Sequence, residues 1–161
     1  MSTFQLAGLP ESTFHPLFAL GEEALRARGA RRVFANEDTG FPCRVSLVDA
    51  RVGEELILLP FEHQSADSPY RAGGPIFVRR DARQAILPPG EVPPYVSRRL
   101  MSLRAYDAAD MMIDADVVEG GEVARKLDAM FADRAVAYIH LHNARRGCYS
   151  CLARRVPPTG D

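Results

Sequence analysis

The segment HLHNARRGCYSC, residues 140–151, gathers several side chains that can do chemistry. It places two histidines, an asparagine, two arginines and two cysteines within twelve positions. Histidine and cysteine bind metals, move protons and act as nucleophiles, whereas arginine pairs with carboxylates and phosphates. The segment can therefore form a metal site, a Cys/His catalytic pair, a polar ligand pocket or an ordinary hairpin.

Alternating side chains predict a strand over residues 136–142. One face would carry only apolar residues and should lie against a core, while the other would carry both histidines. A five-residue loop over 143–147 would lead to a second strand, because Gly147 can adopt a left-handed conformation. The apolar face consists of Ala137, Ile139 and Leu141, and the other face of Val136, Tyr138, His140 and His142.

This loop length sets the register of the hairpin. Cys148 is expected opposite His142, and Ser150 opposite His140. A slip of one residue would bury the histidines and expose the aliphatic residues, so the register is self-consistent. It groups Cys148 with the two histidines and places Tyr149, Cys151 and Ala153 on the apolar side.

Three interpretations of the hairpin follow. Cys148 and His142 can form a catalytic pair with His140 beside them, because opposed residues have Cβ atoms about 4.5–5.5 Å apart. A four-ligand zinc site would need Cys151 from the wrong face, which leaves His140, His142 and Cys148 as a three-ligand zinc alternative. Outside that alternative no cofactor is expected. In the plainest interpretation Cys148 fills space and the imidazoles are half-buried polar groups.

Two further blocks supply polar side chains. In FPCRVSL, residues 41–47, alternation places Cys43 toward the core and Arg44 on the polar side. In SLRAYD, residues 102–107, Arg104 shares a face with Tyr106. Both arginines are therefore candidates for binding an anionic group.

A long polar loop is expected over EHQSADSPYRAGGP, residues 62–75, between two strands. Loops of this kind often cover binding sites. Glu62 and His63 can supply acid–base chemistry, and Tyr70 with Arg71 can hold a carboxylate or phosphate. A surface ion pair between Glu62 and Arg71 is the alternative.

Together these residues favour a pocket for a small anionic ligand. A hydrolase or transferase acting on a carboxylate or phosphate compound through the Cys/His pair is the enzymatic version. The alternative is a non-catalytic interaction domain in which the same residues form a structural hydrogen-bond network. The expected catalytic residues are Cys148, His142 and His140, and the expected ligand-binding residues are Arg44, His63, Tyr70, Arg71, Arg104 and Asn143.

Composition excludes several classes of protein. The 161 residues carry a net charge of -1, without the strongly basic surface that a nucleic-acid partner would need. No apolar run is long enough for a membrane span, and the N-terminus has no secretory pattern. Three cysteines are too few for a disulfide scaffold. A cytoplasmic protein with no nucleic-acid or membrane partner is expected, and its oligomeric state is left open.

The sequence predicts an α+β fold in one domain over residues 1–156, with a frayed tail at 157–161. A largely antiparallel sheet of about six to eight strands is expected, because most gaps between strands are too short for a crossover helix. Two main helices are expected, one that starts after Thr13 or His15 and ends just before Gly29, and one over 121–132. The predicted strands lie within residues 31–37, 42–49, 54–63, 74–80, 98–106, 115–120, 136–142 and 148–156.

Five blocks in this order resemble the DUF1203 family, whose members are mostly bacterial single-domain proteins of unknown function. They are GFPCRVSL (40–47), EHQSADSPYRAGGPIFVRR (62–80), SLRAYD (102–107), MIDADVVEGGE (112–122) and YIHLHNARRGCYS (138–150). The resemblance runs from about Phe4 to Val156 and implies no known reaction. This sequence has Phe61 where tyrosine is frequent and Gly73 where serine is common. The polar positions that the resemblance implies are Cys43, Arg44, Glu62, His63, Ser68, Tyr70, Arg71, Arg104, Tyr106, Asp107, His140, His142, Asn143 and Cys148.

Overall fold

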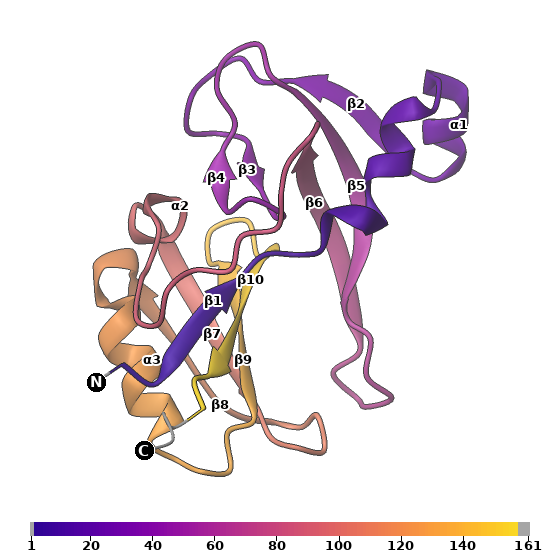
Figure 1. The fold of residues 1–161 in the computed structure, drawn as a ribbon. Helices are drawn as coiled ribbons and strands as arrows, with labels where there is room; N and C mark the ends of the chain where they lie inside the picture. Colours follow the sequence, from indigo (N-terminus) through magenta and orange to yellow (C-terminus); the bar gives the residue numbers. More distant parts are fainter. Residues whose placement is uncertain (1, 158–161) are drawn as a thin grey trace.

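The computed structural model of the chain describes residues 2–157 and contains two five-stranded sheets, which are named sheet A and sheet B here (Figure 1). Pairing is antiparallel except between β3 and β6. Sheet A has the order β1 (Phe4–Ala7), β10 (Tyr149–Arg155), β9 (Tyr138–Asn143), β7 (Leu100–Tyr106), β8 (Met112–Glu119). Sheet B has the order β2 (Arg31–Phe34), β5 (Glu55–Gln64), β6 (Ala72–Arg79), β3 (Pro42–Cys43), β4 (Val48–Asp49).

The predicted α+β class and the dominance of antiparallel pairing are confirmed. The strands form two sheets, however, and not one sheet of six to eight strands. Each predicted segment contains a strand, but residues 42–49 hold two short strands, β3 and β4, joined by a tight turn. Strand β1 was not predicted, because four residues are too few to show alternation and the partner strand β10 lies at the far end of the chain.

The helices are shorter than expected. The first predicted helix is divided into a 3₁₀ segment, His15–Ala19, and the helix α1 (Glu22–Ala27), and another 3₁₀ segment, Glu11–Thr13, precedes it. Leu20 is extended and Gly21 follows it, which separates the second 3₁₀ segment from α1. The second predicted helix is confirmed as α3 (Val123–Phe131), preceded by a 3₁₀ turn at Gly120–Glu122. A short helix α2 (Pro94–Ser97) occupies the end of the proline-rich stretch.

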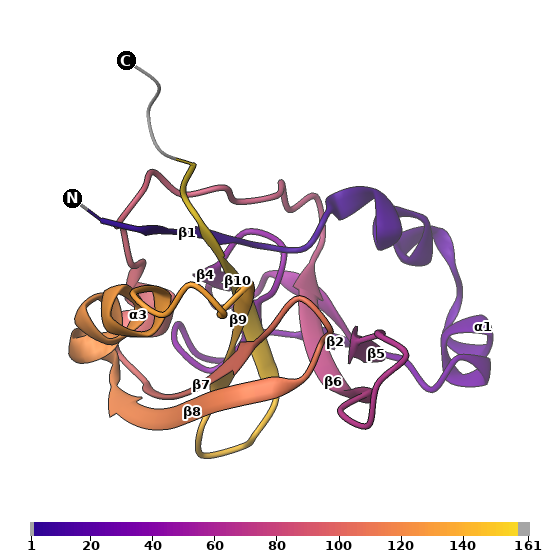
Figure 2. The same ribbon diagram turned by 90° about the horizontal axis from the view of Figure 1, so that it is seen from below.

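Each sheet has its own core. Helix α3 covers one face of sheet A (Figure 2), where Leu127 and Phe131 pack with Leu103 and Leu141. The helical segments before β2 cover sheet B, where Phe14 and Leu25 lie in a second cluster of buried apolar residues. The opposite, polar face of sheet A is therefore free to carry a site.

The chain passes from sheet A to sheet B directly after β1, at Gly8. The Gly8 amide donates to the carbonyl of Ala85 at 2.8 Å, and the Leu9 amide donates to that of Arg44 at 2.9 Å. A Cβ atom on Gly8 would stand 2.1 Å from the carbonyl oxygen of Val45, which is closer than any side chain tolerates. Glycine at this position allows the crossing strand to hold the turn that carries Arg44.

No helix of the described part, residues 2–157, is long and apolar enough to cross a membrane. Most of the predicted frayed tail, residues 158–161, lies outside the described residues.

The substitution Gly8→Ala is expected to destabilise the protein by about 1–3 kcal/mol, because the added methyl group forces the crossing segment away from Val45. Chemical denaturation followed by circular dichroism measures this. Gly21→Ala is the matched control, because no atom lies within 4 Å of a Cβ at that position. A Gly8→Ala protein as stable as the Gly21→Ala protein would show that the close approach is not required.

Candidate functional site

The turn between β9 and β10 differs from the predicted hairpin. Tyr149, and not Cys148, lies opposite His142, and an extra residue at Ser150 makes the register shift before Cys151 pairs with Leu141. The loop between the strands has five residues, as expected, but covers 144–148 and not 143–147. Gly147 has a φ of 81°, as predicted. The prediction failed because alternation alone does not reveal a bulge, and small polar Ser150 fits either face.

The bulge separates Cys148 from the histidines. The Asn143 amide donates to the Cys148 carbonyl at 2.9 Å, so these two residues are neighbours across the turn. Side chains of opposed residues share a face, which places Cys148 with Asn143 on the side of the sheet away from His142. The predicted Cys148–His142 pair is therefore not formed. Cys151 is buried in the core of sheet A, as predicted.

The start of strand β9 differs from the prediction. Val136 and Ala137 precede β9, which begins at Tyr138. Val136 is buried and Ala137 is exposed, which is the reverse of the predicted pattern. From Ile139 onward the predicted faces are correct.

Arg44 is the largest fully buried side chain and is only 1% exposed. It was predicted on a polar strand face, but it lies in the tight turn between β3 and β4, where Leu47 has a φ of 54°. Its Nε donates to the carbonyl of Tyr149 at 2.7 Å, and its Nη1 donates to that of Pro42 at 2.5 Å. Its Nη2 lies 3.0 Å from the Cys148 sulfur. Within residues 2–157 no carboxylate forms an ion pair with it.

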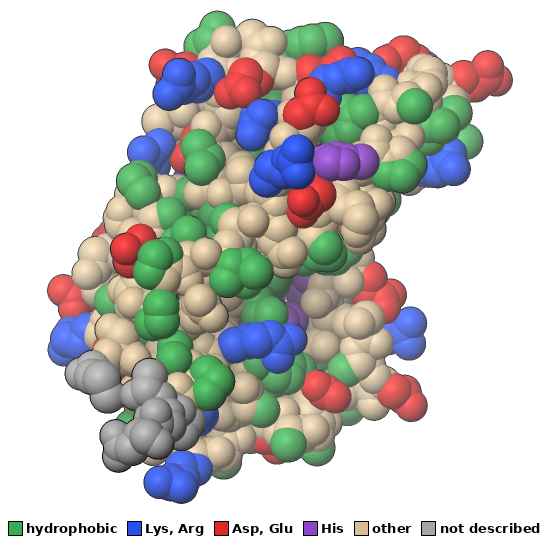
Figure 3. Space-filling view, viewed as in Figure 1, with side chains coloured by type: hydrophobic (Ala, Val, Ile, Leu, Met, Phe, Trp, Pro, Cys, Tyr) green, Lys and Arg blue, Asp and Glu red, His purple; other side chains and the backbone are tan. Residues whose placement is uncertain are grey.

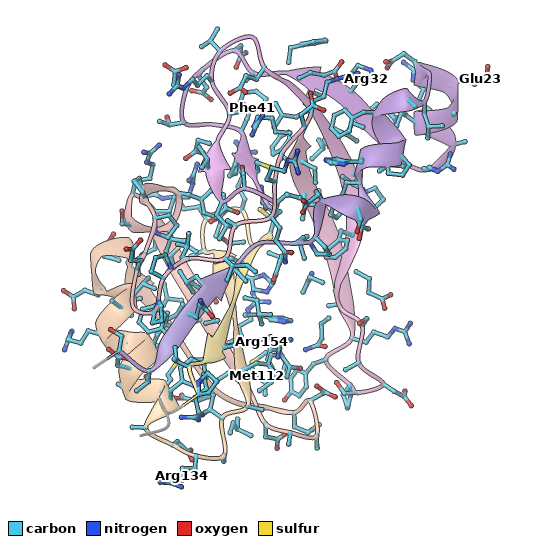
Figure 4. The ribbon with its side chains drawn as sticks, viewed as in Figure 1. Glu23, Arg32, Phe41, Met112, Arg134 and Arg154 are labelled. Atoms are coloured by element: carbon cyan, nitrogen blue, oxygen red, sulfur yellow. The ribbon has the colours of Figure 1, made fainter. Side chains whose placement is uncertain are left out.

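A cavity of about 570 Å³ opens beside Arg44 and Cys148. Arg98 and Arg99 on its wall are both paired with buried Asp49, at 3.1 Å and 2.5 Å. Arg145 and Arg146 come from the β9–β10 turn and are exposed. Phe41, which packs on Phe77, lies on the sheet B side of the cavity (Figure 4). The lining residues are Glu37, Thr39, Gly40, Phe41, Pro42, Arg44, Phe77, Arg98, Arg99, Leu100, Glu119, Asn143, Arg145, Arg146 and Cys148.

The other face of β9 carries a second group, named the histidine cluster: His63, His140 and His142. The ring centre of His63 lies 4.8 Å from that of His142 and 6.1 Å from that of His140. His63 comes from the end of β5, so sheet B contributes one imidazole and sheet A two. Figure 3 shows histidine atoms at the bottom of a slot between the two halves of the molecule.

Burial keeps the cluster neutral at pH 7. Loss of hydration lowers the pKa of His140 to about 3 and that of His142 to about 4, and the positive charge of Arg104 acts in the same direction. The contact between His142 and the Gly147 carbonyl opposes this shift. Burial followed by Arg104 also lowers the pKa of His63. Neutral imidazoles retain a lone pair that can accept a hydrogen bond or bind a metal.

Aromatic rings and one hydrogen-bonded chain surround the cluster. Tyr149 stacks on His63 with ring centres 5.6 Å apart. Gln64 donates to the hydroxyl of Tyr138 at 3.0 Å, and that hydroxyl donates to Asp110 at 2.6 Å. This chain links the end of β5 to sheet A and fixes the hairpin over the histidines.

The remaining predicted residues divide between these surroundings. Arg104 lies opposite His140 on β7 and so belongs beside the histidine cluster. Tyr70 lies near Tyr106, with ring centres 6.1 Å apart. Arg71 is exposed and pairs with Glu62 at 3.1 Å, which is the alternative expected from the sequence. The structure therefore brings Arg44, Asn143 and Cys148 together at the cavity, and His63, His140, His142, Tyr70 and Arg104 on the opposite face.

The three-ligand zinc alternative of His140, His142 and Cys148 is not assembled, because the sulfur lies on the other face of β9 from both imidazoles. The Cys148 sulfur lies in the wall of the cavity, 3.0 Å from Nη2 of Arg44 and 3.9 Å from the side-chain nitrogen of Asn143.

Both groups of residues lie in a part of the chain that resembles a known protein family. A family model described as "Protein of unknown function (DUF1203)" matches residues 40–155. The chain belongs to the DUF1203 family. No curated protein and no solved structure matches it. The matched segment contains Arg44, Asn143 and Cys148 of the cavity and the whole histidine cluster of this DUF1203 protein.

Sequence reasoning missed several residues of the DUF1203 chain that shape these sites. Tyr149 was assigned to the core, yet it stacks on His63. Gln64, Arg98 and Arg99 were not singled out, although Gln64 is part of the conspicuous EHQ block. Arg98 and Arg99 gave no signal, because their partner Asp49 is distant in the sequence.

Cys148 is expected to be the one cysteine of this DUF1203 protein that iodoacetamide modifies in the native state. Cys43 and Cys151 are 0% exposed, and burial raises the pKa of the Cys151 thiol to about 12. Intact-mass spectrometry should show one added group in buffer and three in denaturant. Native labelling that persists in a Cys148→Ser variant would contradict this assignment.

The substitution Tyr138→Phe is expected to destabilise the protein by about 1–3 kcal/mol, because Nε2 of buried Gln64 loses its acceptor and the carboxylate of Asp110 loses its donor. Urea denaturation measures the free energy of unfolding. Tyr70→Phe is the matched control, since no hydrogen bond of the Tyr70 hydroxyl is found in the described part of the chain. Equal stability of the two variants would show that the hydrogen bonds of the Tyr138 hydroxyl do not stabilise the contact between the β5–β6 hairpin and sheet A.

Proposed function

We propose that this DUF1203 protein binds a small carboxylate or phosphate compound in the cavity beside Arg44. The observation that carries the proposal is a buried guanidinium group without an acidic partner in residues 2–157. A buried charge is costly unless an opposite charge compensates it. A ligand anion in the adjoining cavity supplies that charge.

The lining of the cavity fits such a ligand. Arg145 and Arg146 stand on its rim, with no ion pair in the described residues, and can contact an anion that enters from solvent. The Oδ1 atom of Asn143 is buried and has no hydrogen-bond partner in the described part of the chain, so it can accept a hydrogen bond from a ligand hydroxyl. These groups favour a hydroxylated carboxylate or a phosphate ester over a purely apolar compound.

The arrangement supports binding better than the thiol hydrolase or transferase expected from the sequence. Covalent catalysis by Cys148 needs a base within hydrogen-bond reach, and His142 lies on the other face of β9. Glu37 and Glu119 are the carboxylates of the cavity lining, and neither is hydrogen-bonded to the sulfur. Cys148 is then a wall residue that reports on occupancy of the cavity.

Titration calorimetry with inorganic phosphate and with malate tests the proposal. Saturable binding of at least one probe is expected, together with slower alkylation of Cys148 when the cavity is filled. Replacing both rim residues in an Arg145→Ala/Arg146→Ala variant should weaken binding about tenfold, because two partly exposed ion pairs are lost. Arg134→Ala is the matched control, since Arg134 is exposed at the other end of the molecule (Figure 4).

The proposal would be wrong if neither probe binds and neither slows the alkylation of Cys148. That result would favour the alternative in which Arg44 and its neighbours form a structural network. Equal weakening by the rim variant and by Arg134→Ala would show non-specific attraction to surface charge.

A further inference from the structure

The histidine cluster holds three ring nitrogens that have no hydrogen-bond partner among residues 2–157. They are Nδ1 of His63, Nδ1 of His140 and Nε2 of His142, and each of these atoms is buried. His140 is 6% exposed and His142 is 1% exposed. A buried polar atom without a partner costs about 1–3 kcal/mol, so three in one cluster need an explanation.

The tautomer of His142 is fixed by its surroundings. Its Nδ1 lies 3.0 Å from the Gly147 carbonyl oxygen, and a carbonyl only accepts, so Nδ1 carries the hydrogen. Nε2 on the other edge of the ring therefore presents a lone pair. A histidine that donates one ring nitrogen to a backbone carbonyl and leaves the other bare is arranged like a metal ligand.

Among the described residues, no side chain or backbone group forms a hydrogen bond with these three nitrogens. The neighbours of the cluster are the aromatic rings of Tyr106, Tyr138 and Tyr149, together with Arg104 on β7. The hydroxyl of Tyr138 already donates to Asp110. A histidine binds a metal through the bare nitrogen of its uncharged ring.

The spacing of the rings is close to what one ion requires. Three imidazoles on a tetrahedral zinc ion, with Zn–N distances of about 2.0–2.1 Å, place their ring centres roughly 5 Å apart. The observed separations are 4.8 Å, 6.1 Å and 6.5 Å. In residues 2–157 no group of three or more His, Cys, Asp or Glu residues is already placed to hold a metal ion. Two of the three separations must therefore shorten, by about 1–1.5 Å, as the rings turn toward a common centre.

His63 can move toward the other two rings, whereas the 6.5 Å separation of His140 and His142 can close only if their side chains turn. His63 lies where the pairing of β5 with β6 is irregular, between Phe61 and Gln64, and has no partner in the ladder. Its displacement breaks no strand-to-strand pairing, whereas His140 and His142 are held on the central strand β9.

We propose that His63, His140 and His142 close on one divalent transition-metal ion of the zinc class, with the fourth position open to the slot between the sheets. This site is separate from the proposed anion cavity, because the two lie on opposite faces of β9. Imidazole suits Zn²⁺ and Co²⁺ and does not suit Mg²⁺ or Ca²⁺. The ion joins a residue of sheet B to two residues of sheet A.

The test uses the full-length protein, stripped with a chelator and then titrated with Zn²⁺ or Co²⁺. Binding of about one equivalent is expected, with the intense visible absorption of four-coordinate Co²⁺ and a rise in Tm on addition of Zn²⁺. His63→Gln should weaken zinc binding at least about 100-fold, since it removes one of three ligands. This variant is expected to fold, because His63 lies outside the regular β5–β6 pairing, and circular dichroism checks this.

Two controls separate this site from others. His15→Gln removes the remaining, exposed histidine, and Cys148→Ser removes the cavity thiol. Neither should alter the zinc affinity or the cobalt spectrum. Binding below a tenth of an equivalent without a Tm shift would overturn the proposal. Binding that is lost in Cys148→Ser or His15→Gln but kept in His63→Gln would overturn it as well.

Discussion

The guanidinium group of Arg44 ties the two sheets together from inside the protein. It donates to Pro42 next to its own turn in sheet B and to Tyr149 at the start of β10 in sheet A. Because arginine stays charged, its burial is costly unless neighbouring groups stabilise the positive charge. Two carbonyl oxygens and the Cys148 sulfur accept its hydrogen bonds, but these groups supply partial charges and no full negative charge. The cavity lies where a full negative charge would complete the arrangement.

The bulge at Ser150 decides which residues can act together. One additional residue in β10 turns Tyr149 toward the imidazoles and Cys148 toward Arg44. The Cys148 thiol and the imidazoles of His140 and His142 are close in the sequence but lie in two different environments. The thiol lies among arginines, and the imidazoles lie among aromatic rings. The consequence is a strand β9 with a polar residue at the end of each face: His142 on one and Asn143 on the other.

The sequence predicted those features that depend on local periodicity. The apolar face of Ile139 and Leu141, the core position of Cys151, helix α3 and the left-handed Gly147 all follow from spacing and residue type. It could not predict features that depend on distant pairing. Arg44 reaches a carbonyl 105 residues away, and His63 meets His142 only because the β5–β6 hairpin folds over sheet A. The bulge was missed because serine carries no preference for either face.

The family match begins at residue 40, but the two sheets begin earlier. Strands β1 and β2 form one border of sheet A and of sheet B, respectively, and both precede the matched segment. Phe4 and Leu6 of β1 are fully buried. A chain trimmed to residues 40–155 would leave β10 and β5 with unpaired backbone groups along their outer edges, which are templates for aggregation. Expression of this protein for biophysical work therefore requires the N-terminal residues that the family boundaries omit.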